Sequence, residues 1–509
     1  MPFPRASGVL LHPTSFPSRF GIGDLGPEAY RFIDFLAASG QHIWQILPLG
    51  PTGYGDSPYQ CFSAIAGNPL LISLESLRDQ GLLPDADLDQ QPELPLKVDF
   101  GWVIHIKYPL LRQACEAFRS QSTPEQKQAF TEFCQTKADW LDDYALFMAL
   151  KDAHGGASWH TWEPELVQRQ PEALEAARQA LVDPIFYHQF VQFQFCQQWS
   201  ALKDYANQQR IQILGDLPIY VAHDSAEVWS HPEFFQLDEA TGLPKQMAGV
   251  PPDYFSATGQ LWGNPIYNWQ HLQEQDFSWW VQRFQAMLEC VDLIRIDHFR
   301  GFEAYWAVPQ GETTAVNGEW VQAPGQTFFK HLRDVLGELP IVAEDLGLIT
   351  PEVEALRDDF NFPGMKILQF AFDSDADNPY LPFQYEKNSV VYTGTHDNDT
   401  TLGWFNQRSS EQQERVRQYL GCTSNDGIHW DLIRLAMSSV SNLAIIQLQD
   451  LLGLDSESRM NSPSQESGNW GWRYHSDALT PELAQQLRTL TDLYGRTLKP
   501  LPPAENWSS

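Results

Sequence analysis

The sequence predicts an α/β fold, a (β/α)8 barrel that carries large insertions between its barrel strands. Short apolar runs recur along the chain with helix-like stretches between them, a pattern that favours a mostly parallel sheet. Polar or acidic residues follow one run after another, as expected when a site lies at the carboxyl-terminal face of a barrel. A doubly wound sheet is the rival fold, but it would gather its functional residues at one crevice.

The first helix and strand can be placed near the amino terminus. Apolar residues follow helical spacing from Pro27 to Ser39, with Pro27 suited to the first turn and Gly40 to the carboxyl-terminal cap. The apolar run 42–49 comes next and suits a buried strand. The Gly- and Pro-rich segment 50–59 then predicts a loop.

Further apolar runs of the same kind lead into polar or acidic residues. They are residues 211–214, 291–296, 339–343, 366–371, 390–393 and 442–447. Helices are expected to begin after Thr350 and Thr480, because each threonine can cap a helix whose first residue is proline.

The chain is longer than a barrel requires. A barrel of this kind needs about 250 residues, whereas the chain has 509. We therefore expect one unit over residues 1–509 with two insertions. Residues 71–205 are rich in Leu, Ala, Gln and Glu and predict a mainly helical insertion; residues 225–285 are rich in Trp, Pro and Gly and predict a loop-rich insertion over the active site.

Charge and composition exclude several classes of partner. The net charge of −32, from 65 acidic and 33 basic residues, argues against binding to nucleic acid or to an anionic membrane. The chain has no apolar run of about 18 residues and no signal-peptide pattern. Its six cysteines are far apart and form no C-x-x-C pair, which indicates reduced thiols. We expect a cytoplasmic protein without a metal or other cofactor; the oligomeric state stays open.

Three acidic residues are the candidate catalytic groups. Asp297, Glu344 and Asp397 each stand where an apolar run ends, and Asp216 follows another run. Acidic residues at strand ends are also common as structural caps, which is the alternative reading. Cleavage of a sugar–sugar bond with retention needs one carboxylate as nucleophile and one carboxylic acid as proton donor.

The neighbours of these acids suggest separate roles. Arg295 precedes Asp297 by two residues, so both side chains share one face of a strand, and the guanidinium favours an ionised carboxylate. Glu344 follows Ile-Val-Ala, and both burial and nearby carboxylates would raise its pKa. His298 and His396 adjoin two of the acids and are either substrate contacts or ordinary buried histidines.

Aromatic residues make up 13% of the chain, including 18 Trp. They are consistent with a tryptophan-rich core and equally with carbohydrate binding, because the C–H face of a sugar ring packs on a flat aromatic side chain. Both readings stay open. No G-x-S-x-G elbow of a serine hydrolase and no H-E-x-x-H zinc motif is present.

Nine short motifs occur in a specific order over nearly the whole chain. They are Ser7–Ser15, Gly55–Gln60, Gly215–Val221, Gly249–Ser256, Gly259–Pro265, Arg295–Gly301, Ala343–Gly347, Thr395–Asn398 and Gly468–Arg473. In this order the sequence resembles the 4-α-glucanotransferases, also called amylomaltases or disproportionating enzymes, which are α-amylase-like retaining enzymes. The resemblance implies Asp297 as nucleophile, Glu344 as general acid and base, and Asp397 as stabiliser of the transition state.

The resemblance also implies a set of substrate contacts and a substrate class. The expected contacts are Tyr54, Ser57, Tyr59, Asp216, Asp253, Tyr254, Trp262, Arg295, His298, Asp345, His396 and Asn461. Tyr54 corresponds to a position outside the active cleft, and the segment Asp253 to Trp262 to a loop that folds over bound glucan. Its aromatic residues either bind an acceptor and exclude water or only pack the insertion onto the barrel.

The expected partners are maltooligosaccharides and other α-1,4-glucans. The expected reaction moves a segment of a 1,4-α-glucan to the 4-hydroxyl of an acceptor. An α-glucan hydrolase with the same site is the nearest alternative. A non-catalytic glucan-binding protein and a metal hydrolase are more distant alternatives.

Overall fold

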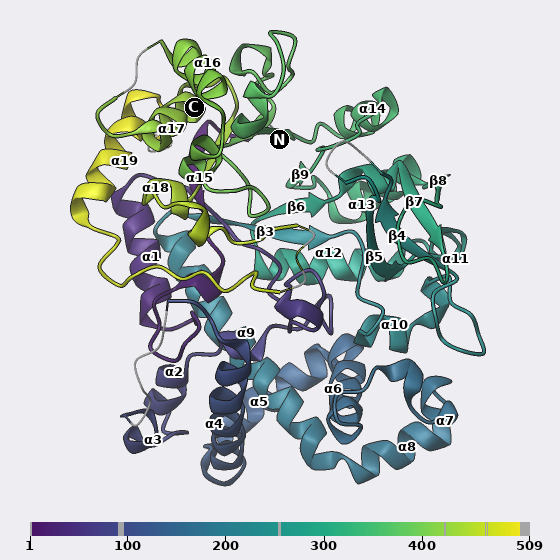
Figure 1. Cartoon of the computed structure of the whole chain (residues 1–509). Coiled ribbons are helices and arrows are strands. Elements are labelled where there is room, and N and C mark those ends of the chain that lie inside the picture. The colour runs from purple at the N-terminus through teal and green to yellow at the C-terminus, as the bar shows by residue number, and fades with distance from the viewer. Residues whose placement is uncertain are drawn as a thin grey trace, which may run out of the picture.

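Eight parallel strands close into a barrel in the order β1-β12-β11-β10-β9-β6-β3-β2 (Figure 1). The computed structural model describes residues 3–89, 96–252, 256–421, 424–463, 465 and 467–498. The barrel strands are β1 Ala6–Leu10, β2 Ile43–Gln45, β3 Gln212–Pro218, β6 Leu293–Asp297, β9 Ile341–Ala343, β10 Gly364–Ile367, β11 Ser389–Tyr392 and β12 Leu443–Gln447. The predicted barrel is confirmed.

The barrel strands are the short apolar runs of the sequence. Strands β1, β11 and β12 are buried over their whole length, because helices cover the outside of a parallel barrel and side chains fill its inside. The run 366–371 departs from the prediction: its first part forms β10, but residues Leu368–Phe372 turn into a 3₁₀ helix. That turn brings Gln369 and Phe370 to the cleft described below.

Helices surround the barrel, and several begin and end as their sequences predict. Helix α1 (Pro27–Ala38) starts at its proline, and Gly40 follows with a φ of 73°. Helices α14 (Pro351–Asp359) and α19 (Pro481–Leu493) have Thr350 and Thr480 at their amino-terminal caps. The other helices beside the barrel are α9 Val182–Gln208, α12 Ser278–Cys290, α13 Gly325–Leu336, α15 Thr401–Asn406, α16 Ser410–Leu420, α17 Ile428–Ser438 and α18 Leu448–Leu451.

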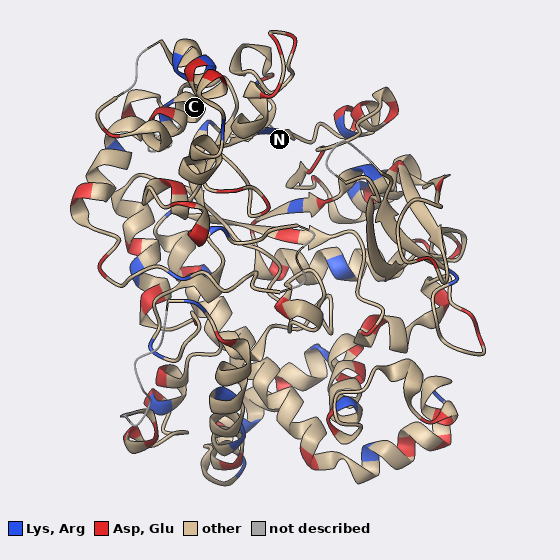
Figure 2. Cartoon of the chain, viewed as in Figure 1, with Lys and Arg blue, Asp and Glu red and all other residues tan. Residues whose placement is uncertain are grey.

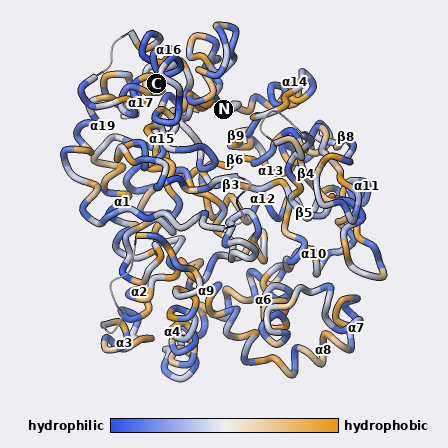
Figure 3. The backbone as a smooth tube through the Cα atoms, viewed as in Figure 1, coloured by the Kyte–Doolittle hydropathy of each residue, from blue (hydrophilic) through white to orange (hydrophobic). Residues whose placement is uncertain are grey.

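After the loop that follows β2, the described residues of the segment 74–180 are mainly helical. The helices are α2 Leu74–Asp79, α3 Asp85–Asp89, α4 Phe100–Gln121, α5 Pro124–Thr136, α6 Ala138–Ala153, α7 Pro164–Val167 and α8 Pro171–Ala180. They lie below the barrel in Figure 1. Hydrophobic and hydrophilic residues alternate along them (Figure 3), as expected for helices with one buried face. Phe118, Phe130 and Phe193 pack together in their core.

A second sheet lies beside the barrel, at the right of Figure 1. Its antiparallel strands are ordered β5-β4-β7-β8, with β4 Gln246–Val250, β5 Gln260–Pro265, β7 Ala304–Pro309 and β8 Glu319–Gln322. Residues 225–285, expected as a loop-rich insertion, contain β4, β5, the short helices α10 (Ala226–Ser230) and α11 (Trp269–Glu274), and the start of α12. The sequence of this range does not reveal the sheet, because β4 pairs with β7, which lies beyond barrel strand β6 in the chain.

Charge is distributed over the whole fold. Acidic residues occur on the barrel helices, the helical segment and the second sheet, with basic residues among them (Figure 2). None of the helices in the described ranges has the length and apolar character needed to cross a membrane. The five cysteines that the structure describes are all free thiols.

Candidate active site

A cleft of about 1030 Å³ opens at the carboxyl-terminal ends of the barrel strands. Residues from the loops after β2, β3, β6, β9, β10, β11 and β12 line it. Asp297, Glu344 and Asp397 all border this one cleft. The strand ends therefore bring together three acids that are up to 100 positions apart in the sequence.

Asp297 ends strand β6 and is held by a guanidinium. Arg295 donates from Nη1 to Asp297 Oδ1 at 2.9 Å, and the same nitrogen lies 2.7 Å from both carboxylate oxygens of Asp216. Asp216 and Arg295 are register partners on β3 and β6. Burial alone would lower the pKa of Arg295, but the charges of Asp216 and Asp297 raise it well above its ordinary value. Asp297 thus forms an ion pair with a guanidinium that Asp216 holds in place.

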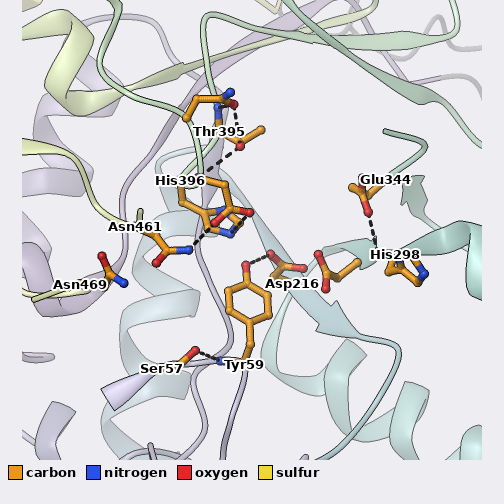
Figure 4. A network of polar contacts seen from close by, with 12 residues as sticks. Ser57, Tyr59, Asp216, His298, Glu344, Thr395, His396, Asn461 and Asn469 are labelled. Atoms are coloured by element: carbon orange, nitrogen blue, oxygen red, sulfur yellow. Dashed lines mark hydrogen bonds and ion pairs between the residues drawn. The ribbon is translucent and has the colours of Figure 1, made fainter. Parts of the chain in front are cut away.

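Glu344 follows β9, the strand next to β6 in the barrel. Its carboxylate accepts a hydrogen bond from the backbone N–H of His298 at 2.7 Å (Figure 4). It also accepts one from the backbone N–H of Leu346 at 3.1 Å. Burial raises the pKa of Glu344 to about 8; the Arg295 guanidinium opposes this shift and the charge of Asp297 adds to it. Glu344 therefore carries a proton at neutral pH.

The backbone of His298 is strained, and its conformation allows the hydrogen bond from the His298 N–H to Glu344. Its φ of 51° and ψ of 50° lie in the left-handed region, which residues other than glycine rarely adopt. The turn directs its N–H at Glu344 and places its ring edge-on to Trp262, 4.9 Å between centroids. Burial lowers the pKa of His298 to about 4, so the ring is neutral. Its Nε2 is buried and has no partner in the described structure.

Asp397 lies in the loop after β11 and is oriented by two side chains. Asn461 donates from Nδ2 to Oδ1 at 2.6 Å, and His396 Nε2 lies 3.3 Å from Oδ2. The loop itself is fixed by Thr395 Oγ1, which accepts from the Asp397 N–H at 3.3 Å. In Figure 4, Asn461 and His396 lie on the side of the site opposite Glu344 and His298.

Aromatic rings continue the wall on the Asp397 side. Tyr59 stacks on His396 at 5.2 Å between ring centroids and donates its hydroxyl to Asp216 at 2.7 Å. Ser57 borders the cleft and accepts from the Tyr59 N–H at 3.2 Å. Tyr54 lies at the margin with 75% of its surface exposed.

Comparison with known proteins identifies the family. The family model described as 4-alpha-glucanotransferase matches residues 11–480. The chain belongs to the 4-α-glucanotransferase family. It is 61% identical to the 4-alpha-glucanotransferase of Synechocystis sp. over 497 residues, covering 97% of this chain and 98% of that protein. It is 51% identical to the enzyme of the same name from Thermus thermophilus, covering 97% and 99%.

A solved structure agrees with this assignment over the whole fold. The amylomaltase from Streptococcus agalactiae in complex with acarbose superposes with a TM-score of 0.94 at 42% identity, covering 97% of this chain and 99% of that one. The amylomaltase from Corynebacterium glutamicum has a TM-score of 0.75 at 19% identity, covering 97% of this chain and 74% of its own, and so shows the shared fold alone.

Two of the expected 4-α-glucanotransferase contacts do not border the cleft. Asp216 is buried beneath it and holds Arg295 and Tyr59. Asp345 is turned away toward helix α14, where it accepts from Arg357 Nη1 at 2.5 Å and from the Met365 N–H at 2.7 Å. Successive residues of an extended chain point to opposite sides, so Asp345 faces outward where Glu344 faces the cleft.

The remaining expected contacts divide between two groups. Tyr54, Ser57, Tyr59, Trp262, Arg295, His298, His396 and Asn461 all border the cleft. Asp253 and Tyr254 lie outside the described residues.

Three tryptophans of the cleft are not among the contacts expected from the sequence. Trp470 packs on both Tyr59 and His396, at 5.9 and 6.0 Å between centroids, and Trp404 and Trp320 also line the cleft. Trp470 lies in the motif Gly468–Arg473 and could have been carried over from it. Trp320 lies outside every quoted motif, so only the pairing of β7 with β8 reveals its place.

Proposed function

We propose that this chain transfers a segment of a 1,4-α-D-glucan to the 4-hydroxyl of glucose or of another 1,4-α-glucan, with retention at the anomeric carbon. The observation that carries the proposal is the pair of acids at neighbouring strand ends. Asp297 is ion-paired to Arg295, whereas Glu344 has a pKa of about 8. A retaining enzyme needs this pair, one ionised nucleophile and one protonated acid.

In the first step, a carboxylate oxygen of Asp297 attacks the anomeric carbon of the bound glucose unit. Glu344 gives its proton to the glycosidic oxygen, so that the leaving segment departs with a 4-hydroxyl. A covalent ester between Asp297 and the glucan remains. Asp397, held by Asn461 and His396, supplies negative charge beside the sugar as its ring becomes oxocarbenium-like.

In the second step, Glu344 acts as a base. Now ionised, it takes the proton of the acceptor 4-hydroxyl, whose oxygen attacks the same anomeric carbon and releases Asp297. The two inversions give overall retention. A positioned acid and base of this kind contributes about 10²–10⁴ in rate.

The acceptor sugar competes with water at about 55 M, so transfer depends on how well the acceptor is placed; well-oriented groups reach effective molarities of about 10⁵ M or more. Trp262 borders the cleft and packs against His298, beside the Glu344 contact. We assign it to acceptor binding and water exclusion, together with the aromatic residues of the segment 253–262.

Incubation with maltotriose tests the function directly. Transfer yields glucose and a ladder of longer maltooligosaccharides without a net gain of reducing ends. Hydrolysis would instead yield glucose and maltose with reducing ends rising in proportion, and would favour the hydrolase alternative. Activity in the presence of a chelator is the expected result, and its loss would favour a metal hydrolase. The cytoplasmic location remains a prediction from the sequence.

A further inference from the structure

Trp320 is an exposed aromatic residue on the wall of the cleft. It lies on β8, the edge strand of the second sheet, where 41% of its surface is exposed. It borders the same cleft as Asp297 and Glu344. A large ring left exposed inside a binding cleft is a candidate contact for a ligand.

The ring of Trp320 is supported from behind. The guanidinium of Arg300 lies 3.8 Å from its centroid. Its register partner Trp306 on β7 packs edge-on at 5.3 Å between centroids. The Trp306 indole N–H is used by the Ala315 carbonyl at 2.8 Å, whereas the indole N–H of Trp320 has no hydrogen-bond partner among the residues that the structure covers.

Arg300 is a buried cation beside Trp320. It is only 6% exposed and forms no ion pair within the described ranges. Its Nη1 donates to the Leu348 carbonyl, and its buried Nε has no partner in the described part of the chain. Arg408 makes a similar stack on Trp404, at 4.3 Å, but is also ion-paired to Asp373. Arg300 therefore gives the exposed ring a fixed, cationic backing.

The position of this pair in the cleft identifies the part of the substrate it faces. Arg300 follows His298 by two residues, and its partner Leu348 lies in the loop that begins with Glu344. His396 and Asn461, which contact Asp397, lie on the side opposite Glu344 and His298 (Figure 4). The proton donor of a retaining enzyme contacts the oxygen between the attacked sugar and the leaving sugar. The wall beyond Glu344 is thus the side of the leaving segment and of the incoming acceptor.

We propose that Trp320, backed by Arg300, is a distal sugar-binding platform on the acceptor side, which holds a glucose unit of an acceptor glucan remote from the reacting 4-hydroxyl. The inference rests on the proposed transfer function and adds a preference for acceptor length. One face of a pyranose ring is lined with C–H groups and packs on the face of the indole that Arg300 does not cover. A few polar groups around an apolar surface are typical of such sites.

The test separates acceptor binding from donor cleavage. An α-maltotriosyl fluoride donor loads Asp297 without a sugar leaving group, and acceptors from glucose to maltohexaose are then varied. For Trp320→Ala we expect the KM for maltohexaose to rise about 3- to 10-fold, the size of one lost aromatic contact. The KM for glucose should stay within about twofold, because a single glucose cannot occupy both the reacting position and the platform.

Two further variants keep the test sharp. Trp320→Phe retains an aromatic face and should restore the maltohexaose KM to within about twofold of the unmodified chain. Phe383→Ala removes a side chain that is 65% exposed but does not border the cleft, and should leave the KM for both acceptors unchanged.

Equal changes for glucose and maltohexaose, or no change for either, in a Trp320→Ala variant that transfers would overturn this inference alone. Fluoride release without any elongated product from the unmodified chain would overturn the proposed function, and the inference with it.

Discussion

The ends of strands β6 and β9 hold carboxyl groups in opposite surroundings, although the strands are neighbours in one barrel. At β6, Asp297 faces a guanidinium that is itself fixed by a second carboxylate. At β9, Glu344 has backbone N–H groups as its hydrogen-bond partners and a pKa of about 8. The same position in the fold thus holds carboxyl groups with different partners, an ion pair at β6 and a raised pKa at β9.

This difference arises from different levels of structure. Arg295 reaches Asp297 because a strand repeats every two residues, so the contact is local in sequence. The Glu344 contact instead depends on the left-handed turn at His298, 46 positions earlier in the chain. The ion pair of Asp297 is therefore specified locally, whereas the raised pKa of Glu344 requires the closed barrel.

Removal of the nucleophile should have the largest effect. Asp297→Asn keeps the shape of the side chain but cannot form the covalent intermediate, so transfer from maltotriose should fall on the order of 10⁴-fold or more. Product chromatography measures this loss. Full activity of the variant would show that the carboxylate at β6 is structural.

Removal of the acid should have a smaller effect that depends on the donor. Glu344→Gln should lower kcat/KM for maltotriose about 10²–10⁴-fold. The release of fluoride from a glycosyl fluoride should fall much less, because fluoride leaves without a proton. Equal losses on both donors would contradict the assignment of Glu344 as the acid.

Removal of the Arg295 guanidinium should lower both the free energy of unfolding and the transfer activity. Arg295→Met leaves Asp216 and Asp297 without their shared partner, so the free energy of unfolding should fall by about 3–5 kcal/mol, measured by urea titration. Lys107→Met is the matched control: Lys107 is buried 3.7 Å from Asp24 and does not border the cleft. The Lys107→Met control should lose stability but keep transfer activity. An Arg295→Met variant that keeps both its stability and its activity would refute the role of the ion pairs of Arg295 with Asp216 and Asp297.

Removal of the Trp262 side chain should have the smallest effect, on whether water or an acceptor sugar consumes the covalent intermediate. Trp262→Ala should raise the ratio of hydrolysis to transfer by about three- to tenfold, the scale of one aromatic contact with the acceptor. The ratio is obtained from reducing ends released against chain lengths redistributed. An unchanged ratio would mean that Trp262 only packs β5 against the loop after β6.

Much of the barrel and the site follows from local sequence patterns. Apolar runs that end in Asp297 or precede Glu344 mark strands whose carboxyl ends meet at one face, and the spacing of Arg295 and Asp297 predicts their contact. Asp345 shows the limit of this reasoning: a motif brings its position to the site, but the alternation of the chain turns its side chain toward Arg357.

The parts that the sequence does not reveal depend on pairing between distant segments. Strands β4 and β7 are separated in the chain by barrel strand β6, and their short sequences carry no signal for their pairing. The exposed position of Trp320 follows from the same sheet, because β8 pairs only with β7 in the described structure. The left-handed conformation of His298 is likewise not predictable from the sequence, because the residue is not a glycine.

The pH dependence of the two donors tests the contrast between β6 and β9 most directly. The raised pKa of Glu344 means that its proton is present below about pH 8 and is lost as the pH rises through that value. We predict that kcat/KM for maltotriose declines about tenfold per pH unit above about 8, whereas fluoride release from the glycosyl fluoride shows no such decline. The same alkaline decline for both donors, or a decline for maltotriose that persists in Glu344→Gln, would contradict the account.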